Sequence, residues 1–268
     1  MTDAYILDID SARLRAMAGS YIKVGRGDHH VIALHGWFGS ALGWGTLTDY
    51  LDRARFSYVF PDLRGYGSRR DEAGEFTMAE AAADAIGLAD ALGWDQFSLV
   101  GHSMSGVAIQ HVLLQAPHRV RRLVGVAPVP ASGLPLGQSE WSLFASAAAS
   151  PASRAMIVNR ATGGRLPAAF VDAVVEHSLE NSDETAFGRY LESWARADIL
   201  AQVKGNQVPV KVITGEHDPT QPAAFMEQAW LQPYPNSELE VLPAAGHYPM
   251  FETPVALAAS IEEFLARG

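Results

Sequence analysis

The chain has 268 residues, of which 48% are hydrophobic, with a formal net charge of −10 and no cysteine. This length and apolar content suit one globular domain with a sizeable core. The negative charge argues against a nucleic-acid partner. The absence of cysteine excludes disulfides, thiolate zinc sites and cysteine nucleophiles.

The N-terminal residues, Met1 to Tyr5, lack a basic segment followed by an apolar one. Such a pattern is typical of a secretory signal. Nor does any apolar run approach the roughly 20 residues that a membrane-spanning helix needs. We therefore expect a cytoplasmic protein that does not bind a membrane.

Strand and helix patterns alternate along the first half of the chain. We expect two short strands at residues 4–8 and 11–18, where apolar and polar residues alternate around a turn. The alternation that follows predicts an α/β fold with a mostly parallel, doubly wound sheet. Its expected elements are strands at 30–34, 58–60, 97–100 and 120–126, and helices at 42–51, 77–92 and 104–115.

The character of the sequence changes near Pro128. Residues 129–205 contain loops and helical patterns but no strand pattern, and the α/β pattern then resumes. We therefore predict a core of residues 1–128 and 206–268, with a helical cap of residues 129–205 inserted late in the sheet. The expected elements are cap helices at 141–149, 166–179 and 183–200, strands at 208–214 and 238–242, and a final helix at 254–266.

One serine, Ser103, lies between a predicted buried strand and a predicted helix. Gly101 and Ser105 flank it, and small neighbours let such a strained turn close. The turn would lift the hydroxyl toward backbone N–H groups that can stabilise an oxyanion. The pattern departs from Gly-x-Ser-x-Gly because Ser105 replaces the second glycine. Taken alone, Ser103 can also be a helix cap.

The strand at 30–34 ends in a glycine-containing loop, His35-Gly36-Trp37-Phe38-Gly39. This loop could supply a second oxyanion donor, the N–H of Trp37, beside that of Met104. It could also be an ordinary loop in which Trp37 and Phe38 are part of the core. We expect His35 to brace the loop by hydrogen bonds.

Ser103, Asp218 and His247 each follow a predicted parallel strand. The carboxyl ends of parallel strands share one rim, where ligands bind. A serine hydroxyl becomes a good nucleophile when an imidazole takes its proton and a carboxylate orients that imidazole. Among the competing residues, we expect His102 to point away from the site, and Glu216 is the rival acid.

The order Ser–Asp–His along the chain is that of α/β-hydrolase triads. From about residue 11 to residue 266 the chain resembles the α/β-hydrolase superfamily. The resemblance implies that Ser103 is the nucleophile, Asp218 the orienting acid and His247 the general base and acid. The matching stretches are His35-Gly36-Trp37, Asp62-Leu63-Arg64-Gly65-Tyr66-Gly67-Ser68, Gly101-His102-Ser103-Met104-Ser105-Gly106, Gly215-Glu216-His217-Asp218, Gly246-His247 and Glu252-Thr253-Pro254.

The resemblance also implies an oxyanion hole formed by the amides of Trp37 and Met104, and no cofactor or metal. Related dehalogenases and epoxide hydrolases have aspartate at the nucleophile position. A serine there favours hydrolysis of a carboxylic ester or lactone through an acyl-enzyme. We expect a small, largely apolar or aromatic substrate and a monomer or homodimer. The expected substrate contacts are Phe38, Trp141, Phe144, Met156, Phe187, Tyr190, Trp194 and Tyr248.

Other functions on the same scaffold stay open, because the cap and the pocket decide them. One is a carbon–carbon bond hydrolase of diketones from aromatic degradation. Others are a cofactor-free dioxygenase, a hydroxynitrile lyase and a perhydrolase. A small-molecule receptor with residual hydrolysis is an alternative of another class. Slow turnover with tight ligand retention would distinguish it.

Overall fold

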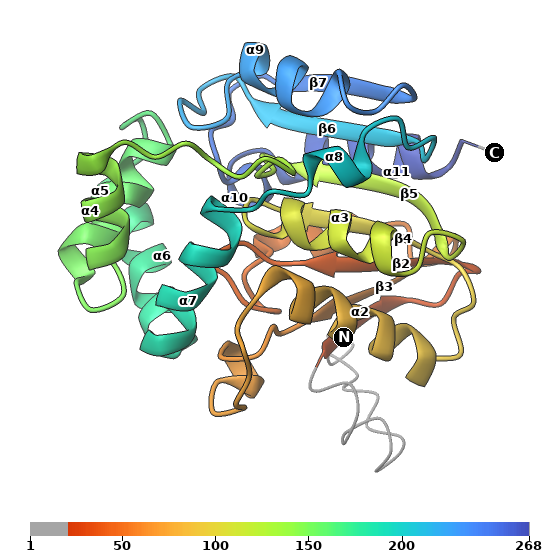
Figure 1. Cartoon of the computed structure of the whole chain (residues 1–268), viewed down its shortest axis with the longest axis horizontal. Coiled ribbons are helices and arrows are strands. Elements are labelled where there is room, and N and C mark those ends of the chain that lie inside the picture. The colour runs from red at the N-terminus through yellow and green to blue at the C-terminus, as the bar shows by residue number, and fades with distance from the viewer. Residues whose placement is uncertain (1–20, 268) are drawn as a thin grey trace.

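A computed structural model describes residues 21–267, and the strands expected at 4–8 and 11–18 lie outside them. Within the described part, seven strands form one sheet (Figure 1). They are β1 (Tyr21–Gly25), β2 (His29–Leu34), β3 (Phe56–Pro61), β4 (Phe97–His102), β5 (Val120–Val126), β6 (Val210–Gly215) and β7 (Ser237–Leu242).

The strand order across the sheet is β1-β3-β2-β4-β5-β6-β7. Only the pair of β1 and β3 is antiparallel, and the other neighbouring strands are parallel. Every residue of β3, β4 and β6 is buried, as expected for strands that are covered on both faces. The predicted α/β fold with a mostly parallel sheet is confirmed.

Helices cover both faces of the sheet (Figure 1). Thr77 caps the first of them, since its Oγ1 accepts a hydrogen bond from the Glu80 amide at 3.1 Å. Within residues 21–267, no helix is long and apolar enough to cross a bilayer. The helices around the sheet are α2 (Met78–Ala91), α3 (Ser105–Gln115) and α8 (Leu200–Val203) on one face, α11 (Pro254–Leu265) on the other, and the short α9 (Ala223–Met226) and α10 (Pro249–Glu252).

The segment between β5 and β6 forms helices at the end of the sheet where β5 stops (Figure 1). We call residues 129–205 the cap segment. Apart from an isolated bridge between Ser182 and Tyr66, this segment contains no strand. That it forms a separate cap domain stays a prediction. Besides α8, its helices are α4 (Gln138–Ser146), α5 (Pro151–Ala161), α6 (Ala168–Glu180) and α7 (Glu184–Ala195).

The buried side chain of Arg154 links the helices of the cap segment. Its guanidinium donates to the carbonyl of Ala147 and to the hydroxyls of Ser178 and Ser182. The same group lies 3.9 Å from the ring centroid of Phe187, in a cation–π contact. One side chain thus connects α5 to the end of α4, to α6 and to α7.

Two expected helices differ in extent from the predictions. Residues 42–51 contain only a short 3₁₀ helix, Gly45–Asp49. Gly45 has a φ of +55°, and a Cβ there would lie 2.8 Å from the carbonyl oxygen of Met250. This backbone conformation interrupts an α-helix. The helix expected to reach residue 200 ends at Ala195, and α5 was not expected at all.

Candidate active site

Ser103 occupies a strained turn between β4 and α3. Its φ of +52° lies in the left-handed region, which is uncommon for a residue with a side chain. Backbone hydrogen bonds hold it there. The Ser103 amide donates to Val126, and its carbonyl accepts from Gly106 and Val129. A strained backbone conformation that the surrounding hydrogen bonds hold in place is typical of functional sites.

Ser105 has a structural role at the position where the family pattern has glycine. Its side chain is buried, and Oγ donates a hydrogen bond of 2.5 Å to the carbonyl oxygen of His35. Gly101 packs so closely that a Cβ would lie 2.6 Å from the Ser105 carbonyl oxygen. Ser105 therefore ties the start of α3 to the loop that contains Trp37.

The three residues predicted to form a triad lie together. His247 Nε2 is 2.9 Å from Ser103 Oγ, and His247 Nδ1 is 2.7 Å from Asp218 Oδ2. The three side chains follow β4, β6 and β7, whose carboxyl ends share one edge of the sheet. Since the Asp218 carboxylate accepts from Nδ1–H, Nε2 is free to accept the Ser103 proton.

Asp218 is held as a carboxylate in a buried position. Its Oδ1 accepts from the amide and hydroxyl of Thr220, at 2.8 and 2.6 Å, and from the amide of Gln221 at 3.2 Å. Burial opposes ionisation, but the charge of His247 and these hydrogen bonds prevail and lower the pKa of Asp218. The rival acid, Glu216, has a side chain that is 53% exposed, and it pairs with the neighbouring His217.

The two expected oxyanion donors lie in the turn that contains Ser103 and in a loop that approaches it. Met104 follows it in the turn, and the other loop approaches it so closely that a Cβ on Gly36 would lie 3.3 Å from Ser103 Cβ. Tyr66 Oη donates to the Trp37 carbonyl at 3.0 Å and so anchors that loop. Neither the Trp37 nor the Met104 amide donates to an acceptor within the described residues. Their role as an oxyanion hole stays a prediction.

His35 braces the loop, as expected. Its Nδ1 donates to the Gly36 carbonyl at 2.9 Å, and its Nε2 accepts from the Leu63 amide at 3.2 Å. This pattern requires a neutral imidazole. Burial lowers the pKa of His35 and favours the same form.

The expectation that His102 points away from the site is wrong. Its ring lines the cavity beside Ser103, and its Nε2 donates to the backbone carbonyl of His247 at 2.9 Å. Gly36 leaves the space for this ring, because a Cβ there would lie 2.4 Å from His102 Nδ1. Burial, aided by the nearby charge of His247, lowers the pKa of His102 to about 3. His102 is therefore neutral, and its hydrogen bond to the His247 carbonyl helps to hold the backbone of His247 in place.

A cavity of about 50 Å³ lies beside Ser103 and His247. At roughly 30 Å³ per molecule it holds about one or two waters. Within residues 21–267, no cluster of three or more acidic or histidine side chains is arranged to hold a metal ion. The other lining residues are the expected Phe38, Phe144, Trp194 and Tyr248, together with Trp37, His102, Val129, Leu134, Ile157, Ala161, Thr220 and Gln221.

Comparisons with known proteins identify the family of the chain. The model of the alpha/beta hydrolase family matches residues 31–260. The chain belongs to this family. Among its relatives is a pimeloyl-[acyl-carrier protein] methyl ester esterase of Serratia marcescens, 26% identical over 260 residues, which cover 91% of this chain and 96% of that protein. A hydrolase activity follows from the family and its esterase relatives.

Two further proteins are similar to this hydrolase. A 2-hydroxymuconate semialdehyde hydrolase of Pseudomonas putida is 29% identical over 232 residues, covering 78% of this chain and 77% of that protein. The crystal structure of a bromoperoxidase from Bacillus anthracis matches with a TM-score of 0.83 and 18% identity, covering 92% and 95% of the two chains. At this identity the structural match supports the fold alone.

Several of the expected substrate contacts lie elsewhere in the hydrolase. Met156 is 56% exposed, and Phe187 and Tyr190 are fully buried in packing. The Phe187 ring stacks on Trp37 with centroids 4.1 Å apart, and Tyr190 packs against Tyr66. None of these three lines the cavity beside Ser103, and their role as substrate contacts stays a prediction. A helical pattern does not distinguish the side chains that pack from those that face a cavity.

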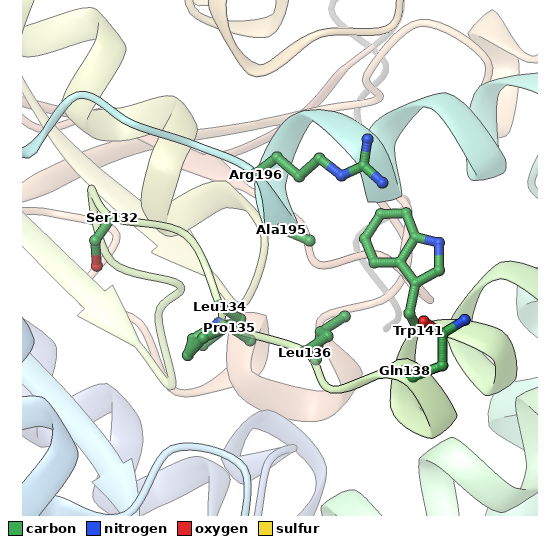
Figure 2. A pocket seen from close by; sticks show the side chains of 8 residues that line it. All are labelled: Ser132, Leu134, Pro135, Leu136, Gln138, Trp141, Ala195 and Arg196. Carbon is green, nitrogen blue, oxygen red and sulfur yellow. The ribbon is translucent and has the colours of Figure 1, made fainter.

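Trp141 lines an outer pocket of about 440 Å³ rather than the cavity beside Ser103. Figure 2 shows Arg196 above the Trp141 ring, and the guanidinium lies 4.3 Å from the ring centroid. Leu134 lines both this pocket and the cavity, so it forms part of the wall between them.

An apolar pocket of about 220 Å³ lies on another side of the cavity. Phe38, His102 and Tyr248 line both spaces, so these three side chains separate them. Phe170 and Val174 of α6 contribute to the apolar wall of this pocket. The hydrolase thus has an apolar pocket near Ser103, and these three side chains separate it from the cavity that contains Ser103.

Proposed function

We propose that this hydrolase is a serine esterase or lactonase that cleaves a small, largely apolar or aromatic substrate through an acyl-enzyme. The observation that carries the proposal is the chain of contacts from Ser103 Oγ to His247 at 2.9 Å and from His247 to Asp218 at 2.7 Å. This is the geometry of a nucleophile, a base and an orienting acid. The left-handed backbone of Ser103 supports the same assignment.

In the first half-reaction, Ser103 Oγ attacks the carbonyl carbon of the ester while His247 Nε2 takes the hydroxyl proton. The Asp218 carboxylate stabilises the imidazolium that forms. The oxyanion of the tetrahedral intermediate accepts hydrogen bonds from the amides of Trp37 and Met104. His247 then gives its proton to the leaving alcohol oxygen, the C–O bond breaks, and the acyl group remains on Ser103.

In the second half-reaction, water attacks the acyl carbon while His247 accepts its proton. Collapse of the intermediate breaks the bond to Ser103 Oγ, which takes the proton back from His247. The carboxylic acid leaves and the triad is restored. With a lactone, the alcohol and the acid stay in one molecule, and the bonds that form and break are the same.

The surroundings of Ser103 support an apolar or aromatic substrate. Aromatic side chains of Phe38, Phe144 and Tyr248 line the cavity, and the apolar pocket of about 220 Å³ lies directly behind Phe38 and Tyr248. The Serratia marcescens relative is named as a methyl ester esterase, which supports an ester substrate.

Hydrolysis of p-nitrophenyl esters from acetyl to octanoyl tests the proposal. We expect a burst of p-nitrophenol equal to the enzyme concentration, and its loss in Ser103→Ala. Esters with longer apolar acyl groups should have a higher kcat/KM than the acetate. If the folded protein hydrolyses no ester and gives no burst, the proposal fails.

A second candidate rests on the Pseudomonas putida relative, which is named as a 2-hydroxymuconate semialdehyde hydrolase. The same triad would then act on a semialdehyde of this class. Turnover of that compound at a kcat/KM above that of every ester would favour this candidate.

A further inference from the structure

The cavity beside Ser103 is too small to hold an ester by itself. Its volume of about 50 Å³ takes about one or two groups of the size of a water molecule, fewer than the heavy atoms of a single ester group. Most of a substrate must therefore extend into neighbouring space. Two such spaces adjoin the cavity, the apolar pocket of about 220 Å³ and the outer pocket of about 440 Å³.

The apolar pocket suits a hydrocarbon chain. Phe170 and Val174 of α6 line it, together with Leu42 on the other side. The polar side chain of His177, which also lines it, already pairs with Ser40, whose Oγ is 3.0 Å from its Nε2. At roughly 30 Å³ per water-sized group the pocket takes about seven such groups, which is enough for a chain of about six carbons.

The outer pocket suits such a chain less well. Ser132, Gln138 and Arg196 contribute polar groups to its lining (Figure 2). The Arg196 guanidinium lies over the Trp141 ring and pairs with Glu192 at 2.7 Å. An apolar chain in this pocket would displace water from these polar groups without replacing its hydrogen bonds. Of the two spaces, the apolar pocket is therefore the better site for a hydrocarbon chain.

Phe38, His102 and Tyr248 separate the apolar pocket from the cavity, and they are held to different degrees. The hydrogen bond to the His247 carbonyl fixes the His102 ring, and Phe38 packs edge to face on Phe187 with centroids 5.4 Å apart. The backbone amide of Tyr248 is hydrogen-bonded, but within residues 21–267 its hydroxyl has no hydrogen-bond partner. Rotation of the Tyr248 side chain to another rotamer therefore connects the two spaces without breaking a hydrogen bond.

The position of His247 indicates which part of the ester enters the apolar pocket. In the proposed mechanism His247 Nε2 protonates the leaving alcohol, so the alcohol oxygen lies beside it. His247 lines the cavity but not the apolar pocket. The pocket instead adjoins the loop of Trp37 through Phe38 and Gly39. We therefore assign the pocket to the acyl side of the ester.

We propose that the apolar pocket binds the acyl chain of the substrate and that the Tyr248 side chain turns aside to admit it. This inference rests on the proposed esterase function and names the substrate class within it, an ester of an aliphatic acid of about six carbons. Each methylene that leaves water for an apolar site improves binding about fourfold, so kcat/KM should rise from the acetyl to the hexanoyl ester.

Substitutions of Val174 test the inference with p-nitrophenyl acetate, hexanoate and octanoate. Val174→Phe fills part of the pocket and should lower the hexanoate-to-acetate ratio of kcat/KM about tenfold. Val174→Ala enlarges the pocket and should raise the octanoate-to-hexanoate ratio about fourfold. The matched controls are Val175→Phe and Val175→Ala. Val175 is also buried on α6 but does not line the pocket, so its variants should keep both ratios.

A crystal structure of the enzyme inactivated by ethyl p-nitrophenyl hexylphosphonate shows the position of the chain directly. Ser103 Oγ forms a bond to phosphorus, its proton passes to His247, and p-nitrophenolate leaves. We expect the hexyl chain to lie against Val174, with the Tyr248 ring turned away from its present position. A hexyl chain in the outer pocket beside Trp141, or an unmoved Tyr248 ring, would contradict the inference.

The alcohol side is tested with ethyl and hexyl acetate by pH-stat titration of the acid released. A gain from ethyl to hexyl acetate that Val174→Phe removes, with no such effect on the acyl series, would overturn the assignment to the acyl chain.

The outcomes separate the two proposals. Ester hydrolysis with the same chain-length ratios in the wild type and in the Val174 variants overturns this inference and leaves the esterase function standing. So does an equal change in the Val175 variants, or a wild type that prefers the acetate. Hydrolysis of no ester at all overturns the proposed function and this inference with it. If Val174→Phe fails to fold, Val174→Ala and the phosphonate complex still decide.

Discussion

The hydrogen bond from Ser105 Oγ to the His35 carbonyl gives the sharpest test of how the site is held together. The bond is 2.5 Å long and fully buried. It joins the start of α3, which follows Ser103, to the loop that contains Trp37. The substitution Ser105→Ala removes it without adding bulk to the tight turn.

The substitution should affect both the stability of the protein and its turnover. Loss of the bond leaves a buried carbonyl without this donor, which should lower the free energy of unfolding by about 1–3 kcal/mol. Complete loss of one oxyanion donor costs on the order of 10²–10³ in kcat. Ser105→Ala displaces the Trp37 amide rather than removing it, so we expect a smaller fall in kcat, of about tenfold, with little change in KM.

Ser98→Ala is the matched control. Ser98 Oγ also makes a buried hydrogen bond, 2.8 Å to His29 Nε2, but it lies near the opposite end of β4 from Ser103. Urea unfolding should show similar losses of stability for both variants, and steady-state ester hydrolysis should show a lower kcat only for Ser105→Ala. Wild-type kcat in Ser105→Ala, or an equal loss in Ser98→Ala, would refute the reasoning.

Three further predictions concern pH, packing and the acid of the triad. The pKa of His102 is lowered to about 3, so below pH 6.5 the unfolded state binds more protons than the folded state. The free energy of unfolding should therefore fall as pH drops from 6.5 toward 3, by about 1.4 kcal/mol per pH unit for this group, and urea unfolding of His102→Gln should show a shallower fall. Arg154→Ala should lower the unfolding free energy by about 3 kcal/mol in thermal unfolding, because several buried hydrogen bonds are lost, whereas the exposed Arg196→Ala should change it by less than about 0.5. Asp218→Asn should lower kcat about 10⁴-fold in ester hydrolysis, and Glu216→Gln should leave it unchanged.

Each of these predictions has a result that contradicts it. If the stability of His102→Gln and that of the wild type depend on pH in the same way, groups other than His102 take up the protons on unfolding. Equal thermal stabilities of Arg154→Ala and Arg196→Ala would mean that the buried guanidinium does not hold the cap segment together. A large fall in kcat for Glu216→Gln, with Asp218→Asn near the wild type, would reverse the assignment of the acid.

The parts of the fold that could be predicted are those whose signal is local. The strand near 30–34 is an almost continuous apolar run, and the strand expected at 120–126 ends in the buried residues 123–126, as parallel strands covered on both faces require. The helix α5 also had a local signal, since Ser150 caps it and Pro151 occupies its first turn. Its buried face includes the polar residues Ser153 and Arg154, so the sequence shows no clear apolar periodicity there. No strand was predicted at β1, a short strand at the edge of the sheet that pairs only with β3.

The positions of the site residues could be predicted only where a strand end fixes them. Asp218 and His247 follow strands β6 and β7, and so the sheet brings them to Ser103. The orientation of His102 depends on the space left by Gly36, which is distant in sequence. No periodicity predicts that.

The most direct test of the central claim is intact-mass spectrometry of the enzyme quenched during turnover of a slowly deacylating p-nitrophenyl ester, followed by peptide mapping. The mechanism predicts a mass gain equal to one acyl group, located on Ser103 and absent in Ser103→Ala. Ester turnover that persists in Ser103→Ala, or an acyl group on another residue of the wild-type enzyme, would contradict it.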